Sequence, residues 1–575
     1  MRELNSRFRI FFLFLFLIFG ISSGRLFELQ VLEAKKYKKI DEKIHFKKEI
    51  LFSRRGKIFF SDEKTVLAEN RGVAEVCVAP REIENINEVA EFLSKILNQK
   101  KEIILQKLQK RKKDPWIVLK RNFPLEKIEP SKKPPQGVHF IFHLSRFYPQ
   151  NTIFSQGVGF VNKDGKAQYG LEKFYDKILS GKSGYRKGLV DAKGNFIFAK
   201  ENEIKPPEDG ADLVLTIDFQ IQTFIEKILE DAVKKYKARG GTIIVMNPQN
   251  GEILAMSSLP NFNPNEYSKE KNLKVFLNPA VQISFEPGSI FKPITMAGAL
   301  NERVVSPKTS YIDKGFVKIG SYTIKNAGNK VYGKKTMTEV LEYSINTGAV
   351  WVEEKLGNEK FKEYVKKFGF GKKTGIDFPG ESRGDIQNII KPLSREKKIE
   401  FANASFGQGI KTTPIQIATA FSAIANQGKM PWPHLVKKII YPDGREKIVE
   451  PKIIGNPISQ ETAIQLTGML ISVVDKGFGK KAKVKGYFIA GKTGTAQVPW
   501  SYLGIKKKGY SPETIHSFVG YAPAFNPKFL IFIKLDAPQG VRFSADSTGP
   551  LFRKIAQFLF DYYRIPPERE EKEES

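Results

Sequence analysis

A serine and a lysine stand three residues apart in the stretch FEPGSIFKP, as Ser289 and Lys292. Residues i and i+3 share one face of a helix, so the lysine amine can lie against the serine hydroxyl and activate it as a nucleophile. Pro293 is tolerated only near a helix start, where backbone N–H groups and the helix dipole can stabilise a negatively charged oxygen. An ordinary helix start with a surface lysine also fits, and the same spacing recurs in charged sequence at Ser61/Lys64, Ser268/Lys271 and Ser394/Lys397.

Two later clusters favour the chemical interpretation. Residues 344–346 read Ser-Ile-Asn within EYSINTG, and residues 492–495 read Lys-Thr-Gly-Thr within FIAGKTGTAQV. Taken alone, the first cluster fits a helix surface and the second fits a turn. Ser-x-x-Lys, Ser-x-Asn and Lys-Thr-Gly in this order within one domain are, however, the signature of serine enzymes that recognise penicillin. We therefore predict that folding brings the three segments into one cleft.

With these motifs the chain resembles the class B penicillin-binding proteins over nearly its whole length. Further similar stretches are RRGKI, SRFYPQ and GLEKFYDKILSG in the first part, and FGFGKKTGIDFPGE and FGQGIKTTPIQ in the second. The resemblance implies an α+β protein with a penicillin-binding transpeptidase domain, in which helices flank an antiparallel sheet. The expected segments are a cytoplasmic tail at 1–9, a transmembrane anchor at 10–30, a pedestal domain at 31–207, the transpeptidase domain at 208–565 and a disordered tail at 566–575.

The resemblance implies that Ser289 attacks the carbonyl of the penultimate D-Ala in a stem peptide that ends in D-Ala-D-Ala, releasing the last D-Ala and leaving an acyl-enzyme. Lys292 would act as the base, with its pKa lowered from about 10.4 by burial and by nearby cations such as Lys492. Ser344 and Asn346 would relay the proton and hold Lys292 and the substrate amide. An amine of a second stem peptide would then attack the ester and complete a cross-link.

The third cluster would recognise the free carboxylate of the donor peptide. The resemblance assigns this role to Lys492, Thr493 and Thr495, while Gly494 allows a ligand to lie close to the backbone. The backbone N–H groups of Ser289 and Thr495 would form the oxyanion hole, in which one donor typically contributes roughly 3 kcal/mol. β-Lactams, which mimic the D-Ala-D-Ala end, would acylate the same serine.

The serine and Ser-Ile-Asn motifs look more like the division type of class B enzyme than the elongation type, which is the alternative. By resemblance the partners are divisome proteins and a polytopic membrane glycosyltransferase, and the pedestal helices near 82–112 are the expected docking surface. The segment VVDKGFGKKA departs from the family, because Phe478 separates two glycines where Gly-Thr-Gly is common.

Other classes of protein share some of these motifs. A serine β-lactamase or D,D-carboxypeptidase passes the acyl group to water, but the sequence offers no Glu-x-x-Leu-Asn-like deacylation box. A non-enzymatic β-lactam sensor is the second alternative. A Ser-His-Asp hydrolase is not supported, because the only Gly-x-Ser-x-Gly motif, GISSG, lies within the apolar amino-terminal run.

The composition argues against several further functions. The formal net charge is +32, but the lysines are spread along the chain without a zinc-knuckle or aromatic RNA-binding pattern, so nucleic acid is not an expected partner. Cys77 is the only cysteine, which excludes an internal disulfide and a cysteine-based metal site. The five histidines are scattered and form no HExxH motif, so we expect neither a metal nor another cofactor.

The amino terminus predicts a membrane anchor. Three arginines precede the uncharged run Ile10–Gly24, and Arg25 follows it. The run is shorter than the ~20 residues that span a bilayer core, but Arg25 can snorkel and Leu26–Val31 can extend the helix. A cleaved signal peptide is the alternative, although an A-x-A-like site is missing. The basic first residues then lie inside the cell, and the rest of this single-pass protein lies outside the cytoplasmic (inner) membrane.

The remaining sequence must build the scaffold that holds the clusters. Residues 82–98 carry an i, i+3, i+4 apolar stripe typical of an amphipathic helix, and a second helix is predicted at 101–112. Pro206-Pro207 marks the main domain boundary. After this linker, DLVLTIDFQIQTFIEKIL predicts a strand and then a helix, and Asn250-Gly251 predicts a β-hairpin.

Strands are predicted again late in the chain, at 487–490, 517–521 and 529–535, and a closing helix is predicted at 551–563. Because helices fill the middle of the domain, the economical fold is an antiparallel sheet built from the two ends of the domain, with helices packed on it. In this arrangement the Lys-Thr-Gly cluster directly follows the strand at 487–490.

Overall fold

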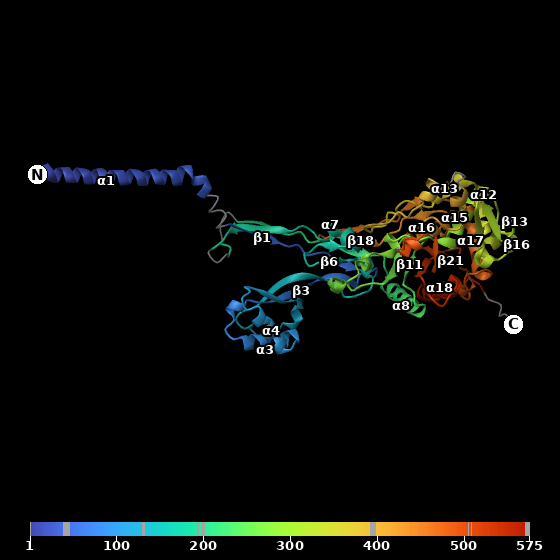
Figure 1. The fold of residues 1–575 in the computed structure, drawn as a ribbon, viewed down its shortest axis with the longest axis horizontal. Helices are drawn as coiled ribbons and strands as arrows, with labels where there is room; N and C mark the ends of the chain where they lie inside the picture. Colours follow the sequence, from blue (N-terminus) through green and yellow to red (C-terminus); the bar gives the residue numbers. More distant parts are fainter. Residues whose placement is uncertain are drawn as a thin grey trace. The chain divides into compact units, whose positions relative to one another are not determined.

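A computed structural model describes residues 2–37, 46–128, 133–191, 195–197, 202–391, 398–503, 505–507 and 509–569 (Figure 1). Internal contacts divide the chain into two compact units, Met1–Gly56 with Ser180–Gly210 and Lys57–Leu179 with Ala211–Ser575. The predicted α+β class is confirmed. Most of the predicted tail, residues 570–575, lies outside the described residues, and the predicted boundary between 207 and 208 stays a prediction.

The first unit contains the amino-terminal helix α1 (Arg2–Phe27), followed by one π-helical turn (Glu28–Leu32). The helical stretch Arg7–Leu32 is strongly apolar, is not buried against the rest of the protein, and is long and apolar enough to cross a membrane. The same unit holds a three-stranded antiparallel sheet of β1 (Phe46–Leu51), β8 (Gly184–Leu189) and β9 (Glu203–Lys205).

The second unit contains a sheet whose strands come from distant parts of the chain. Its order is β19-β18-β10-β2-β3-β4, and β5 also pairs with β3. The short strand β10 runs parallel to β2 and antiparallel to β18, so it joins an early segment to a late one. The bounds are β2 (Ile58–Phe59), β3 (Val66–Val78), β4 (Ile117–Pro124), β5 (Val138–Phe147), β10 (Asp212–Leu215), β18 (Val436–Ile440) and β19 (Glu446–Ile448).

The two predicted pedestal helices are present, as α3 (Ile86–Leu97) and α4 (Lys101–Lys110). The side chain of Asn85 caps α3 by accepting hydrogen bonds from two backbone N–H groups of its first turn. Asn98, in the left-handed conformation, ends the helix. The apolar stripe of α3 is buried against α4, strands β3 and β4 and the first residue of β5.

A five-stranded antiparallel sheet forms the centre of the second unit, in the order β12-β11-β23-β22-β21. Its first two strands precede the helical middle of the domain and its last three follow it, as predicted. Asn250-Gly251 lies in the tight connection between β11 and β12, which confirms the predicted hairpin. The bounds are β11 (Gly240–Met246), β12 (Ile253–Leu259), β21 (Ala490–Pro499), β22 (Tyr510–Ala522) and β23 (Phe529–Asp536).

Both faces of this sheet are covered, because its strands are apolar on both sides. Ile243 and Val245 of β11 pack in a core with α8 and α18, whereas Ile244 and Met246 pack in a second core with α10, α16 and α17. Figure 1 shows α8 and α18 on one side of the sheet and α16 and α17 on the other. The bounds are α8 (Phe219–Lys235), α10 (Lys292–Asn301), α16 (Pro414–Ala425), α17 (Gln460–Asp475) and α18 (Ser544–Tyr562).

Two predicted boundaries near the site are wrong. Strand β21 begins at Ala490 and continues to Pro499, so the Lys-Thr-Gly cluster lies inside the strand and not after it. Its glycines resemble a turn, but β22 pairs with every residue from Ala490 to Gln497, and this pairing overrides local composition. Helix α18 begins at Ser544, well before the predicted start at 551, and it continues through Pro550.

A buried ion pair ties β5 to the short helix α6 (Gly170–Phe174). The Nε of Arg146 donates to Oε1 of Glu172 over 2.6 Å, and the two side chains are 3% and 0% exposed. We predict that Glu172→Gln, which removes the buried negative charge paired with this arginine, lowers the free energy of unfolding by about 3 kcal/mol. Thermal unfolding of the full chain in detergent measures this effect.

The exposed pair Arg71–Glu126 provides the matched control, because its side chains are 36% and 62% exposed. Glu126→Gln is expected to leave the melting temperature nearly unchanged, since solvent already screens this pair. Equal melting temperatures for the two variants would contradict the role given to the buried pair.

Candidate active site

Ser289 lies in a 3₁₀ turn (Gly288–Phe291) that leads directly into α10. The backbone N–H of Lys292 donates to the carbonyl of Ser289, and Pro293 occupies the first turn of α10, as its sequence position predicts. Gly288 has a φ of +58° and donates its N–H to the carbonyl of Gly407 over 2.9 Å. These hydrogen bonds hold the turn at Gly288 on one side of Ser289 and at Lys292 on the other. The half-buried Ser289 therefore stands at the amino-terminal end of a helix.

Lys292 is 1% exposed and connects the first cluster to the second. Its Nζ donates to the carbonyl oxygen of Ser344, to Oγ of Ser344 at 3.2 Å and to Oδ1 of Asn346 at 2.8 Å. Ser344 lies just before α12 (Asn346–Leu356) and has a φ of +53°, a backbone conformation that residues other than glycine rarely adopt. This conformation turns both the carbonyl and the hydroxyl of Ser344 toward the same amine.

Lys492 of β21 reaches the same hydroxyl. Its Nζ donates to Oγ of Ser344 over 3.0 Å and to the carbonyl of Thr493 over 3.0 Å, and the residue is 0% exposed. The Ser344 hydroxyl thus lies between two buried lysine amines that are 200 positions apart in the sequence. The structure brings the second and third clusters together at this point.

The serine turn also lies directly on β21. A Cβ added at Gly494 would stand 2.9 Å from Cγ2 and 3.3 Å from the backbone nitrogen of Ile290, and one added at Gly288 would stand 2.9 Å from Cβ of Ala496. Because Gly288 and Ile290 flank Ser289, the turn and the strand approach each other more closely than side chains would allow. All three clusters therefore share one site, while the catalytic roles assigned to their residues stay predictions.

Polar residues that the sequence analysis did not identify surround Thr495 of β21. Oγ1 of Thr495 accepts from the backbone N–H of Ser544 and donates to its Oγ, each over 3.1 Å. His516 pairs with Thr495 across β21 and β22, and its Nδ1 lies 2.8 Å from Oγ of Ser547. Ser544 and Ser547 both come from the start of α18, so this helix orients Thr495, and neither serine belongs to a recognisable motif.

Burial alters the protonation of the site. The pKa of Lys292 falls well below its ordinary value, first because the amine is buried and second because Lys492 adds a positive charge nearby. Burial lowers the pKa of Lys492 to about 7 and that of His516 to about 4. Among the described residues, no carboxylate forms an ion pair with either lysine. Near neutral pH the site can therefore hold one neutral amine beside one cation.

This arrangement suits a particular kind of chemistry. A neutral buried amine can remove a proton from a hydroxyl, and a buried cation without a counterion can bind a carboxylate. Within the ranges that the structure describes, no group of three or more His, Cys, Asp or Glu side chains is placed to hold a metal ion.

Comparison with known proteins identifies the family. Residues 241–557 match the family described as penicillin binding protein transpeptidase domain, and residues 51–215 match the penicillin-binding protein dimerisation domain. The chain belongs to the penicillin-binding proteins. The combination of these two domains confirms the class B arrangement predicted from the motifs, and the site described above lies within the transpeptidase domain of this penicillin-binding protein.

Relatives cover most of this penicillin-binding protein. Stage V sporulation protein D of Bacillus subtilis is 35% identical over 515 residues, which are 88% of this chain and 78% of that protein. A probable peptidoglycan D,D-transpeptidase, PbpC of Pseudomonas aeruginosa, is 30% identical over 509 residues, 87% of this chain and 86% of that protein. The crystal structure of penicillin binding protein 3 from Mycobacterium tuberculosis, complexed with aztreonam, matches with a TM-score of 0.69 and 26% identity, covering 91% of this chain and 98% of that one.

The close approach of Gly494 to the serine turn yields a test of the site. We predict that Gly494→Ala slows labelling by a fluorescent penicillin by ~100-fold, because the added Cβ would stand 2.5 Å from Oγ of Ser517 and 2.9 Å from Ile290 and would displace the turn that carries Ser289. The labelling rate of the purified full chain is the measurement.

Gly468→Ala in α17 is the matched control, because no atom beyond the neighbouring backbone of α17 lies within 4 Å of the added Cβ. Alanine also favours a helix by about 1 kcal/mol over glycine, so this variant is expected to label at the normal rate and to melt slightly higher. Unchanged labelling of Gly494→Ala would show that the turn and β21 are not closely coupled.

Proposed function

We propose that this penicillin-binding protein is a peptidoglycan D,D-transpeptidase that cross-links stem peptides through an acyl-enzyme on Ser289. The observation that carries the proposal is the pair of buried lysines, Lys292 and Lys492, on either side of the Ser344 hydroxyl and next to the serine turn. The match to the transpeptidase family and the names of the relatives agree with this activity.

The hydrogen bonds of Lys292 support its role as the base. In the ammonium form its three N–H bonds serve the carbonyl of Ser344, Oδ1 of Asn346 and, at the longest distance of 3.2 Å, Oγ of Ser344. The neutral amine has only two N–H bonds and one lone pair, which then faces the serine hydroxyls. As Ser289 attacks the donor carbonyl, its proton passes to this lone pair and later, through Ser344, to the departing D-Ala nitrogen.

The carboxylate of the donor explains why the site keeps a second lysine. Lys492 has no carboxylate partner among the described residues, so a substrate carboxylate can supply the missing counterion, with Thr493 donating a hydrogen bond and Thr495 exchanging its bond to Oγ of Ser544 for one to the substrate. Gly494 leaves space for the peptide to lie along β21, and the N–H groups of Ser289 and Thr495 receive the negative oxygen. A β-lactam carries a carboxylate and a reactive amide and would acylate Ser289 in the same position.

We further propose that the protein acts at the division septum. Residues 1–9 would lie in the cytoplasm, residues 10–30 would span the inner membrane, and the pedestal and transpeptidase domains would lie outside it, which the apolar helix α1 supports. The stretch FEPGSIFKP and the Ser-Ile-Asn triplet favour the division type. The partners would be divisome proteins and a polytopic membrane glycosyltransferase that supplies uncross-linked glycan.

We predict that Ser289→Ala abolishes the covalent adduct that penicillin forms with the full chain, because Ser289 carries the only hydroxyl of the turn Gly288–Phe291 that leads into α10. Intact-protein mass spectrometry detects the adduct. The matched control is Ser268→Ala, which alters an exposed Ser-x-x-Lys serine and is expected to keep the adduct. An adduct on Ser289→Ala, or rapid hydrolysis of the adduct on the normal chain, would contradict a transpeptidase acting through Ser289.

The two lysines also predict a pH dependence. Acylation needs Lys292 neutral and Lys492 charged, so the second-order rate constant for penicillin should rise as Lys292 loses its proton and fall as Lys492 loses its own near pH 7. Lys492→Arg keeps its charge at every pH in this range, so this variant should lack the fall at high pH even if its maximal rate is lower. A profile of Lys492→Arg that still falls near pH 7 would assign the fall to another group.

A further inference from the structure

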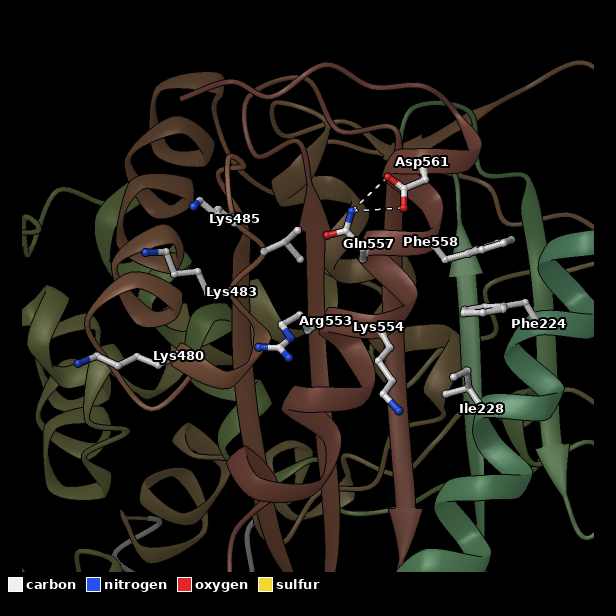
Figure 2. Close-up of a pocket in the computed structure, with 11 residues that line it drawn as sticks. Phe224, Ile228, Lys480, Lys483, Lys485, Arg553, Lys554, Gln557, Phe558 and Asp561 are labelled. Carbon is white, nitrogen blue, oxygen red and sulfur yellow. Dashed lines mark hydrogen bonds between the residues drawn. The ribbon is translucent and has the colours of Figure 1, made fainter. Parts of the chain in front are cut away.

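A groove of about 890 Å³ opens on the second unit between α8, α18 and the segment 480–485 (Figure 2). Its lining includes none of the residues assigned to the transpeptidase site. Five of the lining residues are cations and three are large apolar side chains. The cations are Lys480, Lys483, Lys485, Arg553 and Lys554, and the apolar residues are Phe224, Ile228 and Phe558.

The local structure gathers the cations at this groove. In the segment 480–485, Ala482 and Val484 are buried. Lys483 and Lys485 alternate with them and therefore point outward. On α18, Phe552 and Ile555 pack into the core, which places Arg553 and Lys554 on the outer face of the helix. Figure 2 shows Arg553 and Lys554 on the outer face of α18, and the amine ends of Lys480, Lys483 and Lys485 directed away from that helix.

Lys485 and Lys554 carry charge that no described acidic side chain neutralises. Among the described residues that line the groove, the one acidic side chain is Asp561, which already accepts a hydrogen bond from Gln557 at 3.1 Å. Within the part of the chain that the structure describes, Lys485 and Lys554 form no ion pair, whereas the nearby Lys481 pairs with Asp546 at 2.7 Å. Like charges held this close repel one another, so an anionic ligand gains free energy here that it would not gain from scattered lysines.

One wall of the groove is apolar. The rings of Phe224 and Phe558 stack with centroids 4.0 Å apart, and Ile228 lies one helical turn from Phe224 on α8. These side chains are only half buried, so their outer surface remains in contact with water. A ligand that covers this wall while it meets the cations must be amphipathic.

We propose that the groove is a docking surface for an acidic peptide segment of another protein, with an aromatic or aliphatic side chain that packs on the Phe224–Phe558 wall. A polyphosphate or another anionic polymer without apolar groups would meet the cations but leave this wall exposed. The proposal does not depend on the transpeptidase activity, because none of its residues belongs to that site.

The test measures binding of a fluorescein-labelled probe peptide, Glu-Glu-Phe-Glu-Glu-Phe-Glu-Glu, to the full chain in non-ionic detergent by fluorescence anisotropy. The double variant Lys485→Glu/Lys554→Glu is expected to weaken binding at least tenfold. The control Lys437→Glu/Lys528→Glu makes the same charge change at exposed lysines outside the groove and should bind within twofold of the normal chain. Equal losses in the two variants would show non-specific attraction to a basic protein and would overturn the proposal.

Two further measurements keep the test decisive if the first variant fails to fold. A probe in which both phenylalanines are replaced by alanine should bind at least fivefold more weakly; equal binding of this probe, or tighter binding of inorganic polyphosphate, would overturn the peptide proposal. A probe carrying benzoylphenylalanine at one phenylalanine should cross-link to residues 224–228 or 553–561 of the normal chain. Cross-links confined to other segments would also overturn it.

Discussion

The structure of the site depends on the burial of two lysine amines around one serine hydroxyl. Removing an ammonium group from water is costly, and neither Lys292 nor Lys492 has a carboxylate partner among the described residues. Part of this cost is avoided because the pKa of each amine falls, and part is offset by hydrogen bonds from Lys292 to Ser344 and Asn346. The cost that remains favours a ligand that brings a negative charge, so in the proposed function the same burial would both supply the base and select the substrate.

This arrangement requires a rigid scaffold, because a lysine with solvent access would regain its ordinary pKa. The central sheet provides it. Strand β21 is an edge strand, held on one side by β22, and the serine turn closes over it at Gly494. Two cores cover the faces of the sheet, one under α8 and α18 and the other under α10, α16 and α17. The position of the site at an edge of the sheet leaves room for an extended peptide to lie beside β21.

Much of this could be predicted from the sequence, for identifiable reasons. The three clusters carry ordered motifs, and Pro293 fixes the start of α10, so the candidate residues and the helix start were both accessible. The hairpin at Asn250-Gly251 follows from local turn chemistry. The extent of β21 could not be predicted, because its pairing with β22 is not local. Ser544 and His516 were missed for a similar reason. Neither belongs to a local motif, and only tertiary packing places them beside Thr495.

The division of the central sheet between the two ends of its domain has a consequence for biogenesis. Strand β11 is made long before β23, its neighbour on the inner side, and more than 280 residues of chain must follow before the two can pair. Until then α8, which is made earlier, can cover only one face of β11 and β12, while the other face and the edge of β11 that later pairs with β23 stay exposed, which is a template for aggregation. A newly made chain therefore passes through a long vulnerable stage, and folding factors that shield such hairpins would limit how much active protein a cell obtains.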